Sequence, residues 1–372
     1  MTQPSLPGHA ASALPGHAAS AMFPWQAASA TGVGSLPGTD SREAARIIAG
    51  ELPGFLHCPE LPARGPGADM IGRTAALLAA VSDDFGFETT PAGWRITAGK
   101  GRTLRRAISW LSEDLDALEE TSDGYEGPVK AQVVGPWTMA ASVELPFGER
   151  MLKDPGACRD LADALAEAVR LHVGDLRRRF PRSELIVQWD EPAITAVLEG
   201  SIGTASGISR YSAIEPPKAE AHLRTVLRAT TQAQAMAGVH CCSTHPPIGL
   251  FRSSGAAFVS IDLLSGQVDE NELGELWEAG VGILAGSVPG AGASRVSDTR
   301  ASEPVRAIAA RLGLTDVALM EGVVVTPTCG LASASPDWVR MAYSVCGKAG
   351  RVLREGYGED VDDRDLSRSH HG

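Results

Sequence analysis

The chain has 372 residues, of which 44% are hydrophobic and 5% aromatic, so it can bury one large core. Lysine and arginine total 33 against 45 aspartates and glutamates, and the net charge of -12 excludes nucleic acid as an expected partner. We find no apolar run of about 18 residues and no N-terminal signal segment, so we expect a cytoplasmic protein without a membrane span. The 6 cysteines are too sparse for a disulfide scaffold, which favours metal binding or chemistry.

Residues 1–29 are predicted to form a disordered, low-complexity tail. The octapeptide LPGHAASA occurs at 6–13 and again at 14–21, and a Pro/Gly/Ala/Ser segment of this kind has little to bury. Met22 follows the repeat directly, so it is a candidate for the natural start. We therefore expect one catalytic domain over 30–356, followed by a flexible acidic and polar tail over 357–372.

Beyond the tail, short apolar runs alternate with longer amphipathic ones, as is typical of parallel strands joined by helices. The predicted strands are 31–35, 54–58, 129–135, 184–189, 235–240, 257–262, 281–286 and 322–327. The predicted helices are 41–51, 71–85, 103–118, 155–180, 217–237, 270–279, 303–312 and 336–355, with start signals at Ser41-x-Glu43, Asp154-Pro155 and Ser335-Pro336. This alternation indicates an α/β protein with a (β/α)8 TIM-type barrel. An open doubly wound sheet is the alternative, and residues 86–100 suit a hairpin.

Nucleotide-binding signatures are incomplete. Gly32-Val33-Gly34-Ser35 lacks the third glycine of the dinucleotide fingerprint, and the chain contains no GxxxxGK[ST]. Neither a dinucleotide site nor a P-loop is therefore indicated.

Polar residues gather where the later predicted strands end, in QWDEP at 188–192, HCC at 240–242, SID at 260–262 and TPTCG at 326–330. The carboxyl ends of barrel strands converge on the face that carries active sites. His240, Cys242, Asp262 and Cys329 would then meet as a four-ligand set, whereas Cys241 should point to the opposite side of its strand. Thiolates with an imidazole suit Zn²⁺ better than Mg²⁺ or Ca²⁺. Ordinary buried cysteines are the alternative interpretation.

A zinc ion with two thiolate ligands is a weak generator of hydroxide, but a thiol that joins it loses its proton and stays nucleophilic. The ligand set therefore predicts thiol alkylation rather than hydrolysis.

Six short motifs follow one another along the chain. They are Gly34-Ser35-Leu36-Pro37, Gly135-Pro136-x-Thr138, Gln188-x-Asp190-Glu191-Pro192-Ala193, His240-x-Cys242, Val259-Ser260-Ile261-Asp262 and Cys329-Gly330-Leu331. In this order they resemble the C-terminal catalytic domain of the cobalamin-independent methionine synthase family, over most of 30–355. The resemblance implies a barrel shared with uroporphyrinogen decarboxylases, a Zn²⁺ cofactor, and methyl transfer to the thiol of homocysteine, which forms methionine.

The resemblance also implies roles for single residues. His240, Cys242 and Cys329 match metal ligands, and Asp262 stands where the family has a glutamate. The residues expected to bind the amino acid are Asp190 for its amino group, Glu191 beside it, and the backbone of Gly34 and Ser35 for its carboxylate, and Asp190 is also a candidate catalytic residue. Helix capping by the Asp-Glu pair and a simple turn at Gly-Ser are the alternatives. His245 is a candidate acid near the metal, with a loop position as its alternative.

Departures from the family pattern concern the methyl donor. Ala141-Ser142 stands where the family has Trp-Ser, and Gly286-Ser287-Val288-Pro289-Gly290 replaces an Asp-x-His motif. The donor is therefore left open between methyltetrahydrofolate and a methylcorrinoid, free or on a corrinoid protein. The alternatives to a homocysteine methyltransferase are a related zinc thiol-alkyl transferase with another acceptor, a uroporphyrinogen decarboxylase-like protein, and a non-catalytic zinc-binding barrel.

Overall fold

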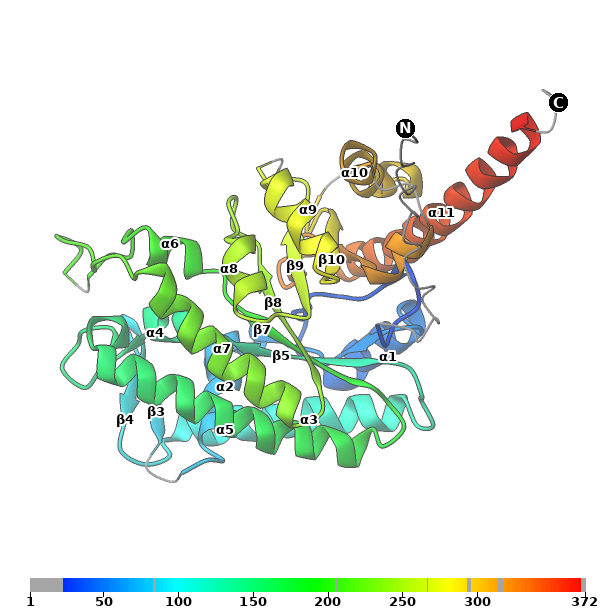
Figure 1. The fold of residues 1–372 in the computed structure, drawn as a ribbon. Helices are drawn as coiled ribbons and strands as arrows, with labels where there is room; N and C mark the ends of the chain where they lie inside the picture. The colour runs from blue at the N-terminus through cyan, green and yellow to red at the C-terminus, as the bar shows by residue number, and fades with distance from the viewer. Residues whose placement is uncertain are drawn as a thin grey trace, which may run out of the picture.

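Eight parallel strands form one curled sheet. They are β1 (Ser29–Ala30), β2 (Leu56–His57), β5 (Val129–Val134), β7 (Leu185–Asp190), β8 (Met236–Cys241), β9 (Phe258–Asp262), β10 (Gly282–Val288) and β11 (Val323–Pro327). The computed structural model describes residues 23–368 except 83–84, 205, 266, 293–295 and 314–316. The hydrogen-bonded order is β1-β11-β10-β9-β8-β7-β5-β2 (Figure 1).

The two ends of this strand order meet just beyond β1 and β2. Ser35 and Glu60 form a parallel bridge there, and the Leu36 N–H donates to the Glu60 carbonyl over 2.8 Å. The bridge brings the first two strands together in chain order, which completes the arrangement of a TIM-type barrel. The predicted fold class is therefore confirmed.

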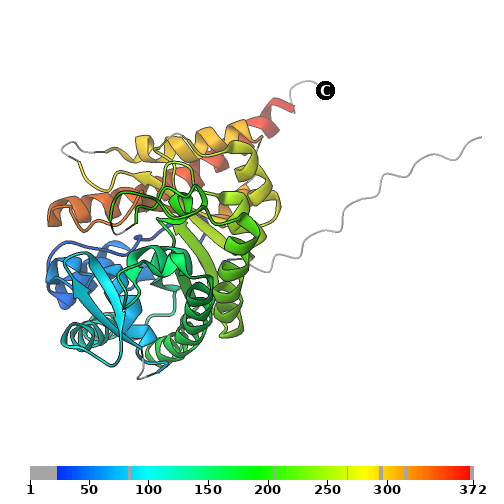
Figure 2. The ribbon, with the colours of Figure 1, turned by 90° about the vertical axis from the view of Figure 1, so that its left-hand side faces the viewer.

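Helices surround the strands (Figures 1 and 2). They are α1 (Ser41–Glu51), α2 (Met70–Leu78), α3 (Arg102–Thr121), α4 (Pro136–Ser142), α5 (Pro155–Arg179), α6 (Ile194–Leu198), α7 (Pro216–Gln232), α8 (Ile248–Ser253), α9 (Glu270–Glu278), α10 (Asp298–Arg311) and α11 (Pro336–Arg368), with three short 3-10 turns, η1 (Pro62–Arg64), η2 (Met151–Lys153) and η3 (Val317–Gly322). Asp154 caps α5 as predicted, whereas the cap of α1 is Asp40. Within the described part of the chain, no helix has the length and apolarity needed to cross a membrane.

Several element boundaries differ from the predictions. The first strand is β1, so the predicted strand 31–35 is instead the segment that leads from β1 to the bridge at Ser35. The predicted helix 217–237 ends at Gln232, because the chain from Met236 onward belongs to β8. Helix α11 continues to Arg368, past residue 357, where the sequence analysis placed a tail.

The predicted hairpin is confirmed and forms a small second sheet. Strands β3 (Gly86–Thr90) and β4 (Gly93–Thr97) pair antiparallel, with Gly86 opposite Thr97. The two-residue strand β6 (Val143–Glu144), which follows α4, extends this sheet by pairing with β4.

Aromatic side chains fill the amino-terminal end of the barrel. Trp25 is 5% exposed and stacks between Phe23 and Phe55, with ring centroids 5.0 and 5.6 Å away. The Trp25 indole N–H donates to the carbonyl of Glu321 over 3.1 Å. Residues 23–29 thus belong to the folded domain, which corrects the predicted tail end at residue 29, while residues 1–22 lie outside the described residues.

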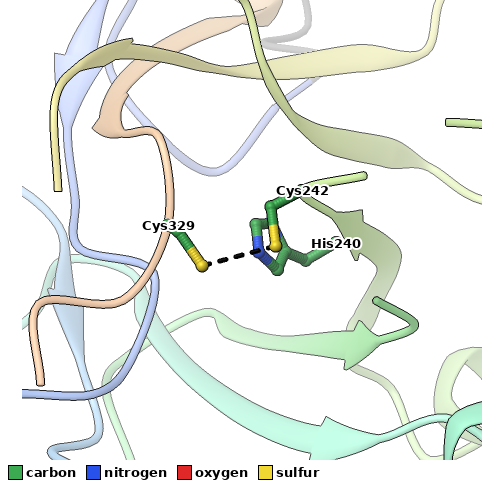
Figure 3. Close-up of side chains that lie close together, drawn as sticks. All are labelled: His240, Cys242 and Cys329. Carbon is green, nitrogen blue, oxygen red and sulfur yellow. Dashed lines mark hydrogen bonds between the residues drawn. The ribbon is translucent and has the colours of Figure 1, made fainter. Parts of the chain in front are cut away.

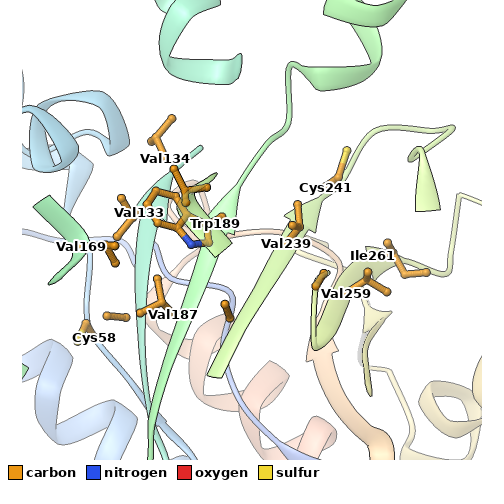
Figure 4. Close-up of a cluster of buried hydrophobic side chains, with 14 of the residues drawn as sticks. Cys58, Val133, Val134, Val169, Val187, Trp189, Val239, Cys241, Val259 and Ile261 are labelled. Carbon is orange, nitrogen blue, oxygen red and sulfur yellow. The ribbon is translucent and has the colours of Figure 1, made fainter. Parts of the chain in front are cut away.

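Side-chain alternation along the strands separates an apolar layer from a polar one. Val187 and Trp189 of β7, like Val239 and Cys241 of β8, pack in the cluster of buried apolar side chains (Figure 4). Successive strand residues point to opposite faces, so Gln188, Asp190 and His240 point the other way, into the barrel. The alternation confirms that Cys241 faces away from the side chains on either side of it.

Candidate functional site

A histidine and two cysteines converge at the carboxyl ends of the strands. His240 lies near the end of β8, Cys242 directly follows that strand, and Cys329 lies two residues beyond β11. Their ligand atoms all lie within 4.8 Å of one another, and the two sulfur atoms are 3.3 Å apart. Figure 3 shows the Cys329 sulfur facing the imidazole ring of His240 and the sulfur of Cys242. The structure therefore brings together three of the four predicted metal ligands.

The ring of His240 is oriented by a neighbouring strand. Its Nδ1 atom lies 3.0 Å from the Ser260 hydroxyl of β9, and the side chain is 4% exposed. A hydrogen-bonded partner on one ring nitrogen fixes the ring and leaves the other nitrogen to bind a metal. Ser260, the first residue of the Ser-Ile-Asp motif, thus has a part in the site.

The two cysteine sulfurs are hydrogen-bonded to each other over 3.3 Å. This contact, with help from His240, lowers the pKa of Cys329 to about 4. The same contact raises the pKa of Cys242, as does its partial shielding from water. A lowered thiol pKa favours metal binding, because cysteine binds metal ions as the thiolate.

The cysteine and histidine side chains form one wall of a cavity of about 410 Å³. Apolar side chains such as Val33, Pro62 and Met70 also line it. Its polar side chains besides the sulfur and imidazole groups are the Ser35 hydroxyl and the carboxylates of Asp69, Asp190 and Glu60, of which Asp69 caps α2 by accepting the Gly72 N–H. A small molecule with one cationic group and one thiol would fit these walls.

Asp190, which was predicted to bind the amino group of the substrate, lies at the end of β7 and lines the cavity. It is 6% exposed, and its Oδ1 accepts a hydrogen bond of 2.7 Å from the Gln188 amide. Burial raises the pKa of Asp190, while His240, the Gln188 amide and Lys130 act in the opposite direction. A buried carboxylate that faces a cavity gains a strong partner when a cation enters.

Glu60 is a site residue that the sequence analysis did not identify. It follows β2 and is 7% exposed, with its Oε1 3.5 Å from the Arg73 guanidinium. Burial raises the pKa of Glu60 to about 7, although Arg73 beside it acts in the opposite direction. Its position two residues beyond the predicted strand 54–58 was the available signal.

The Gly34–Ser35 backbone also lies at the cavity, as predicted. A Cβ atom on Gly34 would lie 3.2 Å from Oε2 of Glu60, so glycine lets the backbone approach the carboxylate closely. The carbonyl of Ser35 accepts the Leu331 N–H over 2.8 Å, which ties this turn to the loop that carries Cys329.

Three predicted site residues neither join the His-Cys-Cys group nor line the cavity. The Asp262 carboxylate accepts the Leu264 N–H over 2.7 Å and so caps the turn after β9, outside the His-Cys-Cys group. Glu191 is fully buried away from the cavity, where the backbone N–H groups of Trp137 and Thr138 at the start of α4 donate to it. His245 is exposed in the loop after β8 and does not line the cavity.

The donor set of the His-Cys-Cys group fits a zinc ion. It offers one imidazole nitrogen and two sulfurs, and Ser260 supplies the outer hydrogen bond that metal-binding histidines usually make. Three protein ligands leave a coordination position for a substrate atom, as in catalytic rather than structural zinc sites.

No protein-family model matches the sequence, and no curated protein matches it. Among solved structures, the chain is similar to a B12-independent methionine synthase from Shewanella sp. W3-18-1 in complex with selenomethionine, with a TM-score of 0.56 and 12% identity over 89% of this chain and 98% of that one. It is also similar to a methyltransferase from Methanosarcina mazei, with a TM-score of 0.48 and 12% identity over 89% of this chain and 94% of that one. At 12% identity the likeness to the methionine synthase structure shows a shared fold alone, so the case for function depends on the site itself.

Proposed function

We propose that the protein is a zinc-dependent methyltransferase that transfers a methyl group to the thiol of homocysteine and forms methionine. The observation that carries this proposal is the shared cavity. Its walls bring the His240, Cys242 and Cys329 group together with the carboxylates of Asp190 and Glu60. A metal site that can bind a thiol, beside carboxylates that can bind an ammonium group, matches an amino acid with a thiol side chain.

A zinc ion held by His240, Cys242 and Cys329 would lower the pKa of a substrate thiol, which then reacts as a thiolate near neutral pH. Asp190 and Glu60 would bind the substrate ammonium group, and the Gly34–Ser35 backbone would bind its carboxylate. In the transfer a sulfur–carbon bond forms, the bond between the methyl carbon and the donor breaks, and the donor keeps that electron pair. Proximity and orientation are the main contributions of these residues.

The likeness to the B12-independent methionine synthase structure supports the part of this proposal that concerns the barrel fold. A uroporphyrinogen decarboxylase-like reaction would leave the paired thiols without a role. Methyltetrahydrofolate and a methylcorrinoid are both retained as donors, because Ala141 and the 286–290 segment depart from the family pattern.

The test is to incubate the zinc-loaded protein with homocysteine and, in separate reactions, methyltetrahydrofolate or methylcobalamin, and to quantify methionine. We expect methionine with one donor, and growth of a methionine auxotroph that expresses the chain. A protein that purifies without metal, or that forms no methionine from either donor, would contradict the proposal. A protein that binds zinc and homocysteine without turnover would favour the non-catalytic alternative.

A further inference from the structure

A fully buried lysine lies beneath the cavity and has no part in the chemistry described above. Lys130 belongs to β5, and its side chain has no exposed surface. Its ammonium group donates to the Val33 carbonyl and to Oε1 of Gln188, each over 2.8 Å. Burying a lysine costs several kcal/mol in principle. A lysine that is buried inside a barrel at this cost is expected to have a specific role.

Its contacts lead to both predicted amino-acid-binding elements. Gln188 accepts from Lys130 through its carbonyl oxygen, and its amide nitrogen donates to Oδ1 of Asp190 over 2.7 Å. The same nitrogen also donates to the Val33 carbonyl over 3.0 Å, one residue before Gly34. Lys130 therefore reaches the cavity through Gln188, without lining it.

Lys130 fixes the accepting end of the Gln188 amide, whose donating end contacts Asp190 and the Val33 carbonyl. A glutamine side chain has an accepting end and a donating end, whereas an ammonium group can only donate. Lys130 consequently holds the Gln188 carbonyl toward itself, and the NH2 group must face Asp190. With the amide reversed, its oxygen would face the carboxylate oxygen and repel it.

The charges beneath the cavity indicate the same role. Asp114 is paired with Arg64 and Arg73, which lie 2.9 and 2.5 Å from it, and Arg73 also lies near Glu60. Among the described residues, Asp190 forms no ion pair of this kind, and the positive charge of Lys130 acts on it across Gln188. Asp190 is therefore held by a hydrogen bond from Gln188 rather than by a direct ion pair, and it lines the cavity.

We infer that Lys130 is a positioning residue for acceptor recognition, which acts through Gln188 to hold the Asp190 carboxylate ready for the ammonium group of an amino-acid thiol. This inference rests on the proposed function. It assigns Lys130 to recognition of the amino group alone, because the residue does not belong to the His-Cys-Cys group.

The test compares two ligands on zinc-loaded protein by titration calorimetry: homocysteine and 4-mercaptobutanoate, which lacks only the amino group. The wild type should prefer homocysteine, and Lys130→Met should weaken homocysteine binding by about tenfold or more with a smaller effect on the analogue. A purely structural role would weaken both ligands equally. Lys153→Met is the control, because Lys153 is an exposed lysine that pairs with Glu149 on the surface.

Gln188→Met provides an independent variant if Lys130→Met does not fold. It removes the hydrogen bonds that connect Lys130 to Asp190 but keeps the lysine, and we expect the same loss of preference for homocysteine. If either folded variant with normal zinc content keeps the full preference, the role of Lys130 is wrong while the proposed function stands. If the wild type itself shows no preference for homocysteine, the proposed acceptor is wrong and the inference fails with it.

Discussion

The sulfur atoms of Cys242 and Cys329 lie 3.3 Å apart, although 87 residues separate them in the chain. The contact arises because β8 and β11 both end at the same face of the barrel, so that residues just beyond each strand meet. Cys241 is adjacent in sequence to Cys242 but packs among apolar side chains on the opposite face of the strand. This pair of neighbours offers a controlled test of the metal site.

Cys242→Ser should lower the zinc content of the purified protein to well below one ion per chain, because a hydroxyl is a much poorer zinc ligand than a thiolate. Cys241→Ala should keep its zinc, since its sulfur contacts the Ser243 hydroxyl at 3.2 Å rather than the site. Elemental analysis and competition with a chelator measure both. Equal metal loss in the two variants would mean that the effect is one of folding, and the assignment of Cys242 would fail.

Asp262→Asn should leave zinc affinity nearly unchanged. The Asp262 carboxylate accepts the Leu264 N–H over 2.7 Å, and an asparagine oxygen can accept the same bond. Loss of a metal ligand or of its outer partner typically lowers affinity by about tenfold or more. A fall of that size in a chelator competition would show that the side chain leaves its turn to bind the ion, as the family resemblance implies.

The strand ends were predictable from the sequence because apolar runs terminate there in polar, metal-binding residues, as at His240 and Cys329. Glu60 was missed because β2 has only two residues, and Glu60 reaches the cavity through the bridge with Ser35 rather than through a recognisable motif. Asp262 illustrates a different limit. Its backbone position was correct, but the side chain is engaged by the local turn, which residue type and spacing do not reveal.

The end of the predicted tail at residue 29 was wrong for a related reason. Low complexity is a property of composition, whereas Phe23 and Trp25 are ordered by aromatic partners such as Phe55 and Phe258, which are distant in sequence. Such tertiary contacts override what a local segment would do alone.

Trp25→Ala should therefore destabilise the barrel by about 3–5 kcal/mol, because it removes a large buried ring from the aromatic cluster and leaves a cavity. It also leaves the Glu321 carbonyl without the indole donor. Trp110→Ala is the control, since that partly buried ring of α3 contacts the guanidinium groups of Arg106 in the same helix and of Arg64 in η1, and its loss should cost about 1 kcal/mol. Urea denaturation measures both. A similar small loss for the two variants would show that residues 23–29 contribute little to stability.

Protonation of His57 should lower the free energy of unfolding as the pH drops below neutrality. Its Nδ1 contacts the Cys58 carbonyl at 3.0 Å, so this nitrogen carries the proton, and Nε2 accepts from the Tyr343 hydroxyl over 2.9 Å. Burial, with Lys130 nearby, lowers the pKa of His57 from 6.5 to about 3. Between these two values the unfolded chain binds a proton that the folded protein does not, so the free energy of unfolding decreases as the pH falls.

The contribution of one such group approaches about 1.4 kcal/mol per pH unit within that window, is about half of that at pH 6.5, and fades at higher pH. His57→Gln keeps a donor and an acceptor but does not titrate in this range, so its unfolding free energy should depend less steeply on pH between 6.5 and 5. Urea midpoints at several pH values in this range give the two slopes, while all other titrating groups are common to both proteins. Parallel slopes would mean that His57 takes up a proton in the folded state, and its place in a neutral hydrogen-bonded chain with Tyr343 would then be wrong.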